Sequence, residues 1–83
     1  MENQEKEDIK ILFSQLLKEL RSTQKISQEK LALEAGLDRT YISLLERKLR
    51  NPTVQVLFAI AKALKIKPSE IVKQIEDKKS PSN

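Results

Sequence analysis

Side chains able to bond with the bases of DNA lie along one side of a segment predicted to be helical, from Asp38 to about Lys48. At about 100° per residue, that side carries Arg39, Thr40, Ser43, Leu44 and Arg47. Arginine bonds bidentately to guanine, hydroxyl side chains bond to bases or phosphates, and leucine contacts the thymine methyl group. An ordinary amphipathic helix with a solvated polar face explains the same pattern, and the helix taken alone favours that interpretation.

The residues before this segment reverse the preference. Ser27 is a good N-cap for a short helix, Gly36 is the expected left-handed residue at its end, and Asp38 is the expected cap of the next helix. Two short helices joined by a tight turn, over residues 27–48, form a helix-turn-helix, which presents the start of its second helix to a major groove. The combination therefore predicts sequence-specific binding of double-stranded DNA.

Other polar residues are suited to the phosphates of DNA. Gln28 lies at a helix N-terminus, where partial positive charge favours binding of an anion such as phosphate. A glutamine that is simply solvated explains the residue equally well. Arg47, Lys48, Arg50 and Asn51 follow the second helix and can clamp phosphates. A solvated basic loop is the alternative, above all for Lys48. The Tyr41 hydroxyl can bond to phosphate or base, while a partly buried tyrosine at the edge of the core explains its position equally well.

The rest of the chain predicts three more helices. Apolar residues at helical spacing indicate a first helix over residues 5–23, Thr53 begins a fourth to about Lys65, and Pro68 opens a fifth. No strand pattern is present. We therefore predict an all-α fold, a compact five-helix domain over residues 1–76, followed by a disordered tail over residues 77–83.

The fourth helix is apolar on two sides. Its main face, expected to meet the core, comprises Val54, Leu57, Phe58, Ala61 and Leu64. Its second face comprises Val56, Ala59 and Ala63. A helix that is apolar all round is usually buried on both faces. In a domain this small, we expect the second face to contact another subunit.

One ion pair is expected inside the domain. Glu46 lies beside the apolar face of the third helix, and Arg21 lies at the end of the first. A structural, partly buried pair and two independent surface charges are the alternatives, and we favour the pair.

Composition excludes several functions. The absence of Cys and His removes disulfides, thiol catalysis, the usual zinc sites and the commonest general base. No catalytic grouping is recognisable, so we expect neither an enzyme nor a metal or cofactor site. No apolar run approaches membrane-spanning length and the N-terminus is acidic, so we expect a cytoplasmic protein that makes no membrane contact. The net charge of +4 includes +3 within residues 21–50.

The order of these residues resembles the phage Cro/repressor-type (XRE) helix-turn-helix family. The resemblance rests on Arg21, S-Q-x-x-L-A over residues 27–32, A-G-L over 35–37, Y-I-S-x-x-E over 41–46 and N-P at 51–52. Within that family, L-D-R-T-Y-I-S over residues 37–43 is most similar to the controller proteins of restriction-modification systems.

The resemblance implies a lambda-repressor-like domain that binds operator DNA as a homodimer. It implies that Gln28 and Asn51 contact phosphate, and that Arg47 and Ser43 support the base contacts. Those contacts would come from Arg39, Thr40 and Tyr41. Family dimers commonly use the fourth and fifth helices, so the implied interface is Val56, Ala59, Ala63, Ile71 and Ile75.

The chain departs from the family where Lys48 replaces a common Gly. A left-handed backbone at this position would therefore carry a cost. Leu44 also replaces the small or polar residue often present, which shifts readout towards thymine methyl groups or contributes nothing.

Two hypotheses about function remain. The first is a dimeric transcriptional regulator acting on a pseudo-palindromic operator. The alternative is a protein-interaction module, such as an antirepressor or antitoxin partner, that keeps the fold. The joint presence of Gln28, Arg39, Thr40, Arg47 and Arg50 favours the regulator. Acidic residues within 1–8 either contact RNA polymerase or have no role.

Overall fold

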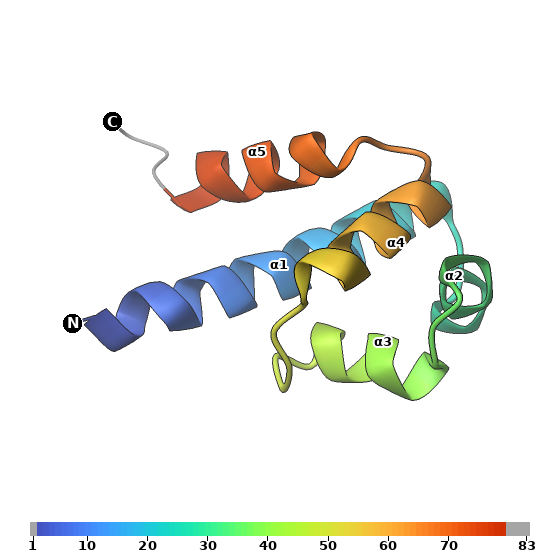
Figure 1. Ribbon diagram of the computed structural model, residues 1–83, viewed down its shortest axis with the longest axis horizontal. Coiled ribbons are helices and arrows are strands. Elements are labelled where there is room, and N and C mark those ends of the chain that lie inside the picture. The colour runs from blue at the N-terminus through green and yellow to red at the C-terminus, as the bar shows by residue number, and fades with distance from the viewer. Residues whose placement is uncertain (1, 80–83) are drawn as a thin grey trace.

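The computed structural model describes residues 2–79, and describes side chains for residues 9–79. It contains five helices: α1 (Glu2–Gln24), α2 (Gln28–Ala35), α3 (Arg39–Glu46), α4 (Val54–Leu64) and α5 (Pro68–Lys79) (Figure 1). No strand occurs between residues 2 and 79. The predicted all-α fold with five helices is confirmed.

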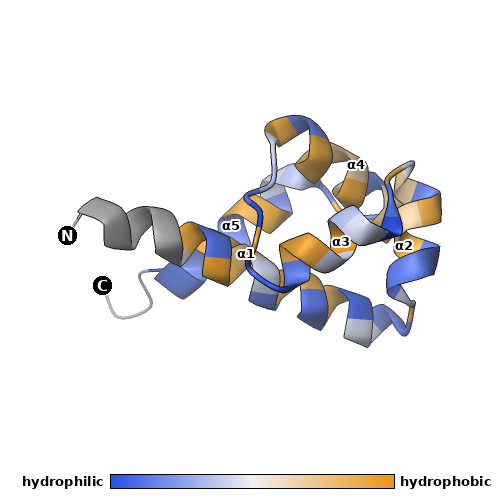
Figure 2. Ribbon diagram, turned by 90° about the horizontal axis from the view of Figure 1, so that it is seen from below, coloured by the Kyte–Doolittle hydropathy of each residue, from blue (hydrophilic) through white to orange (hydrophobic). Residues whose placement is uncertain are grey.

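The helix α1 organises the domain. It runs the length of the molecule, with α5 along one side and α3 along the other, and α4 crosses it (Figure 1). Each helix carries hydrophobic residues interrupted by hydrophilic ones (Figure 2). The hydrophobic side chains removed from water form one core, and this burial is the main force holding the helices together. The buried apolar residues are Phe13, Leu16, Leu17, Leu31, Ala32, Ile42, Leu45, Ile60, Ala61, Ala63, Leu64, Ile71 and Ile75.

The last helix extends further than the sequence pattern predicted. Residues 77–79, assigned to a disordered tail, are helical, and residues 80–83 lie outside the described part of the chain. Two ion pairs support the last turn. Lys78 Nζ lies 3.3 Å from Glu19 Oε2 of α1, and Lys73 Nζ lies 3.4 Å from Asp77 Oδ2 within α5.

The assignment of faces on α4 was partly wrong. Val54 and Phe58, expected in the core, are 74% and 56% exposed, whereas Ala63, expected on the outer face, is buried. The packing of neighbouring helices explains the difference. Helices α1, α2 and α5 all contact α4 and enclose Ala63 and its neighbours in the C-terminal half. In the first turns of the helix, Val54 and Phe58 stay exposed, while Val56 and Leu57 are partly buried against the core.

Four helices end in the same way. A residue with left-handed backbone follows each of α1 to α4 within two positions. In chain order, these residues are Lys25 (φ 57°), Gly36 (φ 70°), Lys48 (φ 65°) and Lys65 (φ 62°). At the end of α3, the Leu49 amide donates to the Leu44 carbonyl (2.9 Å) and the Lys48 amide donates to the Leu45 carbonyl (3.2 Å). These two bonds define a Schellman motif, which satisfies carbonyls that a helix end would leave unpaired. Lys48 therefore has left-handed backbone, the conformation that carries a steric cost for any residue other than glycine.

Lys48→Gly is expected to raise the free energy of unfolding by roughly 0.5–1 kcal/mol, because glycine adopts left-handed backbone without steric cost. Urea unfolding would measure the gain. Lys48→Ala is the matched control, since it removes the charge but keeps the Cβ atom, and it should give no gain. Equal gains from both variants would show that the charge, and not the backbone, is responsible.

Candidate nucleic-acid interface

Local capping interactions set the geometry of the helix-turn-helix. The Ser27 hydroxyl accepts a hydrogen bond from the Lys30 amide (3.0 Å) and so caps α2, as predicted. Gly36 turns the chain, and the partly buried Leu37 packs against the core between α2 and α3. Asp38 occupies the N-cap position of α3 but its side chain makes no capping hydrogen bond, which differs from the prediction. The turn and the partly buried Leu37 therefore orient α3.

The helix α3 presents a polar side away from the core. Ile42 and Leu45 are fully buried, while Arg39, Thr40 and Arg47 are exposed. The predicted contact residues Ser43 and Leu44 are partly buried beside them. The structure thus brings the predicted base-contact residues onto one surface, with Arg39 and Thr40 in the first turn of the helix.

Hydrogen bonding divides these polar residues into two groups. Arg47 Nε donates to Ser43 Oγ at 3.2 Å, which orders both side chains along the helix. Among residues 9–79, the side chains of Arg39 and Thr40 enter no hydrogen bond or ion pair. Their donors and acceptors are therefore available to an outside partner.

A basic loop follows α3. Arg47, Lys48, Arg50 and Asn51 are all exposed, and no acidic residue occurs from position 47 to position 53. The Arg50 guanidinium lies over the half-buried Tyr41 ring, 5.6 Å from its centroid. The loop therefore adds positive charge directly beside the polar side of α3, as a phosphate-binding segment requires.

A buried network fixes α3 to the rest of the domain. Arg21 Nε donates to Glu46 Oε2 (2.6 Å), and its Nη2 donates to Glu46 Oε1 (3.0 Å). The Arg21 Nη1 atom donates to the Ile26 carbonyl (2.9 Å). Glu46 is only 3% exposed. The predicted structural ion pair is confirmed, and it joins the end of α1 to the end of α3.

Gln28 has a partner that the sequence did not indicate. Its Nε2 donates to Glu46 Oε1 at 2.9 Å, so the side chain belongs to the buried network. The polar atoms of Gln28 that this bond does not use could still contact phosphate, and that contact stays a prediction. Gln24 was also missed, and its Nε2 donates to the Leu64 carbonyl at 2.8 Å, which ties α1 to the end of α4. Neither bond has a local sequence signal, because each joins segments that only the fold brings together.

The Glu46 carboxyl is held in its charged form. Burial raises its pKa, but hydrogen bonds from Arg21 and Gln28 and the charge of Arg21 lower it by more. The pKa of Glu46 therefore lies below its ordinary value. The same hydrogen bond raises the pKa of the Arg21 guanidinium.

The predicted dimer residues do not all lie on the surface. Ile71, Ile75 and Ala63 are buried within the single chain, which corrects their assignment to an interface. Their side chains pack in the core because α5 folds back onto α1. Val56 and Ala59 are partly buried and stay predictions.

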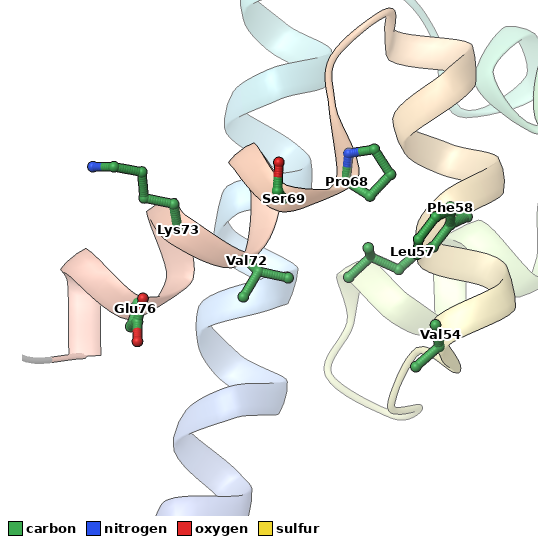
Figure 3. A pocket seen from close by; sticks show the side chains of 8 residues that line it. All are labelled: Val54, Leu57, Phe58, Pro68, Ser69, Val72, Lys73 and Glu76. Carbon is green, nitrogen blue, oxygen red and sulfur yellow. The ribbon is translucent and has the colours of Figure 1, made fainter.

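An apolar groove between α4 and α5 provides a different exposed surface. Figure 3 shows Val54, Leu57 and Phe58 of α4 on one side and Val72 of α5 on the other. We call this the α4–α5 groove, and its lining is Val54, Leu57, Phe58, Pro68, Ser69, Val72, Lys73 and Glu76. A second hollow shares Val54, Leu57 and Val72 and extends towards Asn51 and Pro52 of the basic loop, so the two surfaces adjoin.

Comparison with known proteins identifies the fold family. A helix-turn-helix family model matches residues 17–71, which include all of α2, α3 and α4. The chain belongs to this helix-turn-helix family. It is a helix-turn-helix transcriptional regulator, and the predicted similarity to restriction-modification controller proteins is confirmed. None of the helices described between residues 2 and 79 has the length and apolar character needed to cross a membrane.

Individual relatives within the family are control proteins. The chain is 42% identical to control protein C.BamHI of Bacillus amyloliquefaciens, over 78% of this chain and 82% of that protein. It is 46% identical to control protein C.SmaI of Serratia marcescens, over 69% of this chain and 68% of that protein.

Solved controller structures share the fold. The restriction-modification controller protein C.AhdI from Aeromonas hydrophila superposes with a TM-score of 0.72 at 42% identity, covering 75% of this chain and 94% of that one. Controller protein C.Esp1396I, solved as a tetramer in complex with its natural 35-base-pair operator, gives a TM-score of 0.71 at 35% identity, covering 82% and 95%.

Proposed function

We propose that the protein binds a pseudo-palindromic operator as a homodimer and controls the genes of a restriction-modification system. One observation carries the proposal: Arg39 and Thr40 stand exposed and unengaged in the first turn of α3, beside a basic loop. The start of a recognition helix is the part that enters the major groove. The control-protein relatives support the narrower assignment to restriction-modification.

Each polar residue is given a role by its position. Arg39 and Thr40 would contact base edges, with Tyr41, Ser43 and Leu44 contributing to contacts along α3. Arg47, Arg50 and Asn51 would hold the phosphates that flank the bases, and Gln28 would approach the backbone from the start of α2. Base contacts would thus come from α3 and positioning contacts from the segments around it.

Dimerisation would use the α4–α5 groove together with Val56 and Ala59. Exposed Val54, Phe58 and Val72 give this surface its apolar character. In a two-fold dimer the same surface of both copies meets, and the two α3 helices would enter major grooves about 34 Å apart. This arrangement explains why an operator would be pseudo-palindromic.

We propose that the protein acts in the cytoplasm, with the DNA that it regulates. Contact between acidic residues within 1–8 and RNA polymerase is a further part of the proposal. The side chains of those residues lie outside the described part of the structure.

Selection of bound sequences from a random duplex pool, at about physiological salt, tests the proposal. We expect a palindrome whose half-sites are centred about one helical turn apart. Recovery of no motif, with only weak salt-sensitive binding, would contradict the proposal and favour the protein-interaction module. The exposed α4–α5 groove would then be the surface to probe for a protein partner.

Arg39→Ala is expected to relax selection at one base position in each half-site and to weaken binding by about 1–3 kcal/mol per half-site. Competition between operators altered at single positions would measure this. Lys30→Ala is the matched control, since Lys30 is an exposed cation paired with Glu34 on α2. Unchanged discrimination in the Arg39 variant would show that this residue reads no base.

A further inference from the structure

Tyr41 and Arg50 come from different segments and meet on the surface. Tyr41 lies in the first turn of α3, and Arg50 lies in the loop that follows the helix. The guanidinium carbon of Arg50 is 5.6 Å from the centroid of the Tyr41 ring. The ring itself is half-buried and packs against the core, so it offers a fixed face. A cation placed over such a face is attracted by the ring electrons.

The Arg50 guanidinium has no other partner in the described residues. Among residues 9–79, the Arg50 side chain enters no ion pair and no hydrogen bond. The contact with the ring uses no N–H donor in a hydrogen bond, so the five guanidinium donors have no acceptor among residues 9–79. The side chain is therefore held in place with its donors unoccupied.

The surroundings indicate which ligand suits those donors. Arg50 is exposed, its neighbours Arg47 and Lys48 are also exposed cations, and no acid lies between positions 47 and 53. A guanidinium edge matches the oxygens of a phosphate in geometry and charge. An arginine without the ring contact would sample many rotamers, and ordering it on binding would lower affinity.

We propose that Tyr41 is a positioning residue, whose ring holds the Arg50 guanidinium ready to bind a phosphate of the DNA backbone. The inference rests on the proposed function and adds a role for the ring that is separate from any contact of the hydroxyl. The ring acts through Arg50, so its effect on binding disappears when Arg50 is absent. Phenylalanine at position 41 keeps that effect, because it has the same aromatic face.

A double-mutant cycle tests the pair. Dissociation constants would be measured for the unaltered protein, Tyr41→Leu, Arg50→Ala and the double variant, on a duplex carrying the selected operator. A cation–π contact at an exposed site corresponds to roughly a two- to fivefold effect, and two copies in a dimer would multiply this to roughly 4- to 25-fold. We expect Tyr41→Leu to weaken binding by that factor when it is made in the unaltered protein. When it is made in the Arg50→Ala protein, it should weaken binding further by less than about twofold.

Two further measurements separate positioning from a structural defect. Arg50→Ala should weaken binding as much in the Tyr41→Phe protein as in the unaltered one, because phenylalanine keeps the ring. It should weaken binding less in the Tyr41→Leu protein. Arg50→Ala should lower the slope of log affinity against log salt by about one for each copy of the site, as loss of a phosphate contact requires. A packing defect in Tyr41→Leu would weaken binding equally with and without Arg50.

The outcomes distinguish this inference from the proposed function. Additive losses at positions 41 and 50, or an unchanged salt slope in Arg50→Ala, would overturn the positioning role in a protein that still binds its operator. Failure of the unaltered protein to bind any duplex would overturn the proposed function, and the inference with it.

Discussion

Replacing Glu46 with glutamine is expected to lower the free energy of unfolding by about 3 kcal/mol, because breaking a buried ion pair leaves its partner charge uncompensated. The Glu46 carboxylate accepts two hydrogen bonds from Arg21 and one from Gln28, and it is 3% exposed. A domain of this size has about 5–10 kcal/mol of stability in total. The melting temperature should therefore fall by more than about 10 °C.

Glu34→Gln is the matched control for this variant. Glu34 pairs with Lys30 at 3.4 Å, but both side chains are exposed and lie one turn apart on α2. Such a surface pair contributes at most about 0.5 kcal/mol. A Glu46→Gln protein that melts like the unaltered one would show that the network contributes nothing to stability.

The effect of Glu46 should also depend on pH in a defined direction. Its pKa is lowered in the folded protein, so the unfolded chain takes up the proton more readily. The stability from this carboxylate is present above the ordinary glutamate pKa and is lost as the pH falls through the lowered value. The difference in stability between the unaltered protein and Glu46→Gln should therefore narrow below about pH 4.

Phe58→Glu is expected to convert the proposed dimer into a folded monomer and to weaken operator binding by at least about 100-fold. Phe58 is 56% exposed in the single chain and lines the α4–α5 groove, so the monomer should tolerate the change. In a symmetric dimer the substitution buries two carboxylates against apolar side chains. Each such burial costs several kcal/mol, more than enough for a 100-fold effect.

Leu33→Glu provides the comparison for Phe58→Glu. Leu33 is 79% exposed on α2 and lies outside the groove, so the same change of charge there should leave the dimer intact. Sedimentation equilibrium would give the mass of each variant, and circular dichroism would show that each is folded. A Phe58→Glu protein that remains dimeric at the same concentration would place the subunit contact elsewhere.

The sequence predicted what local chemistry determines. The Ser27 N-cap and the left-handed Gly36 mark helix ends through interactions within a few residues, and both are found. Thr53, predicted to begin the fourth helix, is its N-cap. The pairing of Arg21 with Glu46 was predicted because Glu46 lies beside the apolar face of the third helix and Arg21 lies at the end of the first, and the pair is found.

The outer surface was harder to predict. Periodicity showed two apolar sides on α4 but could not tell which side the other helices cover, so Val54 and Phe58 were placed inside and Ala63 outside. In α5, periodicity assigns Ile71 and Val72 to one apolar stripe, but Ile71 is buried and Val72 is 51% exposed. The Gln28–Glu46 bond joins residues 18 positions apart and depends wholly on how α2 and α3 pack.

The left-handed lysines at the helix ends also affect how quickly the protein would find its operator. Lys25, Lys48 and Lys65 contribute three charges to the net +4, so glycine at all three would leave +1 (4 − 3). Long-range attraction between a positive protein and DNA speeds their encounter and permits sliding along the duplex. A chain with glycine at these positions would fold more stably but would find its operator more slowly. The three lysines therefore lower the stability of the fold and raise the rate of association with DNA.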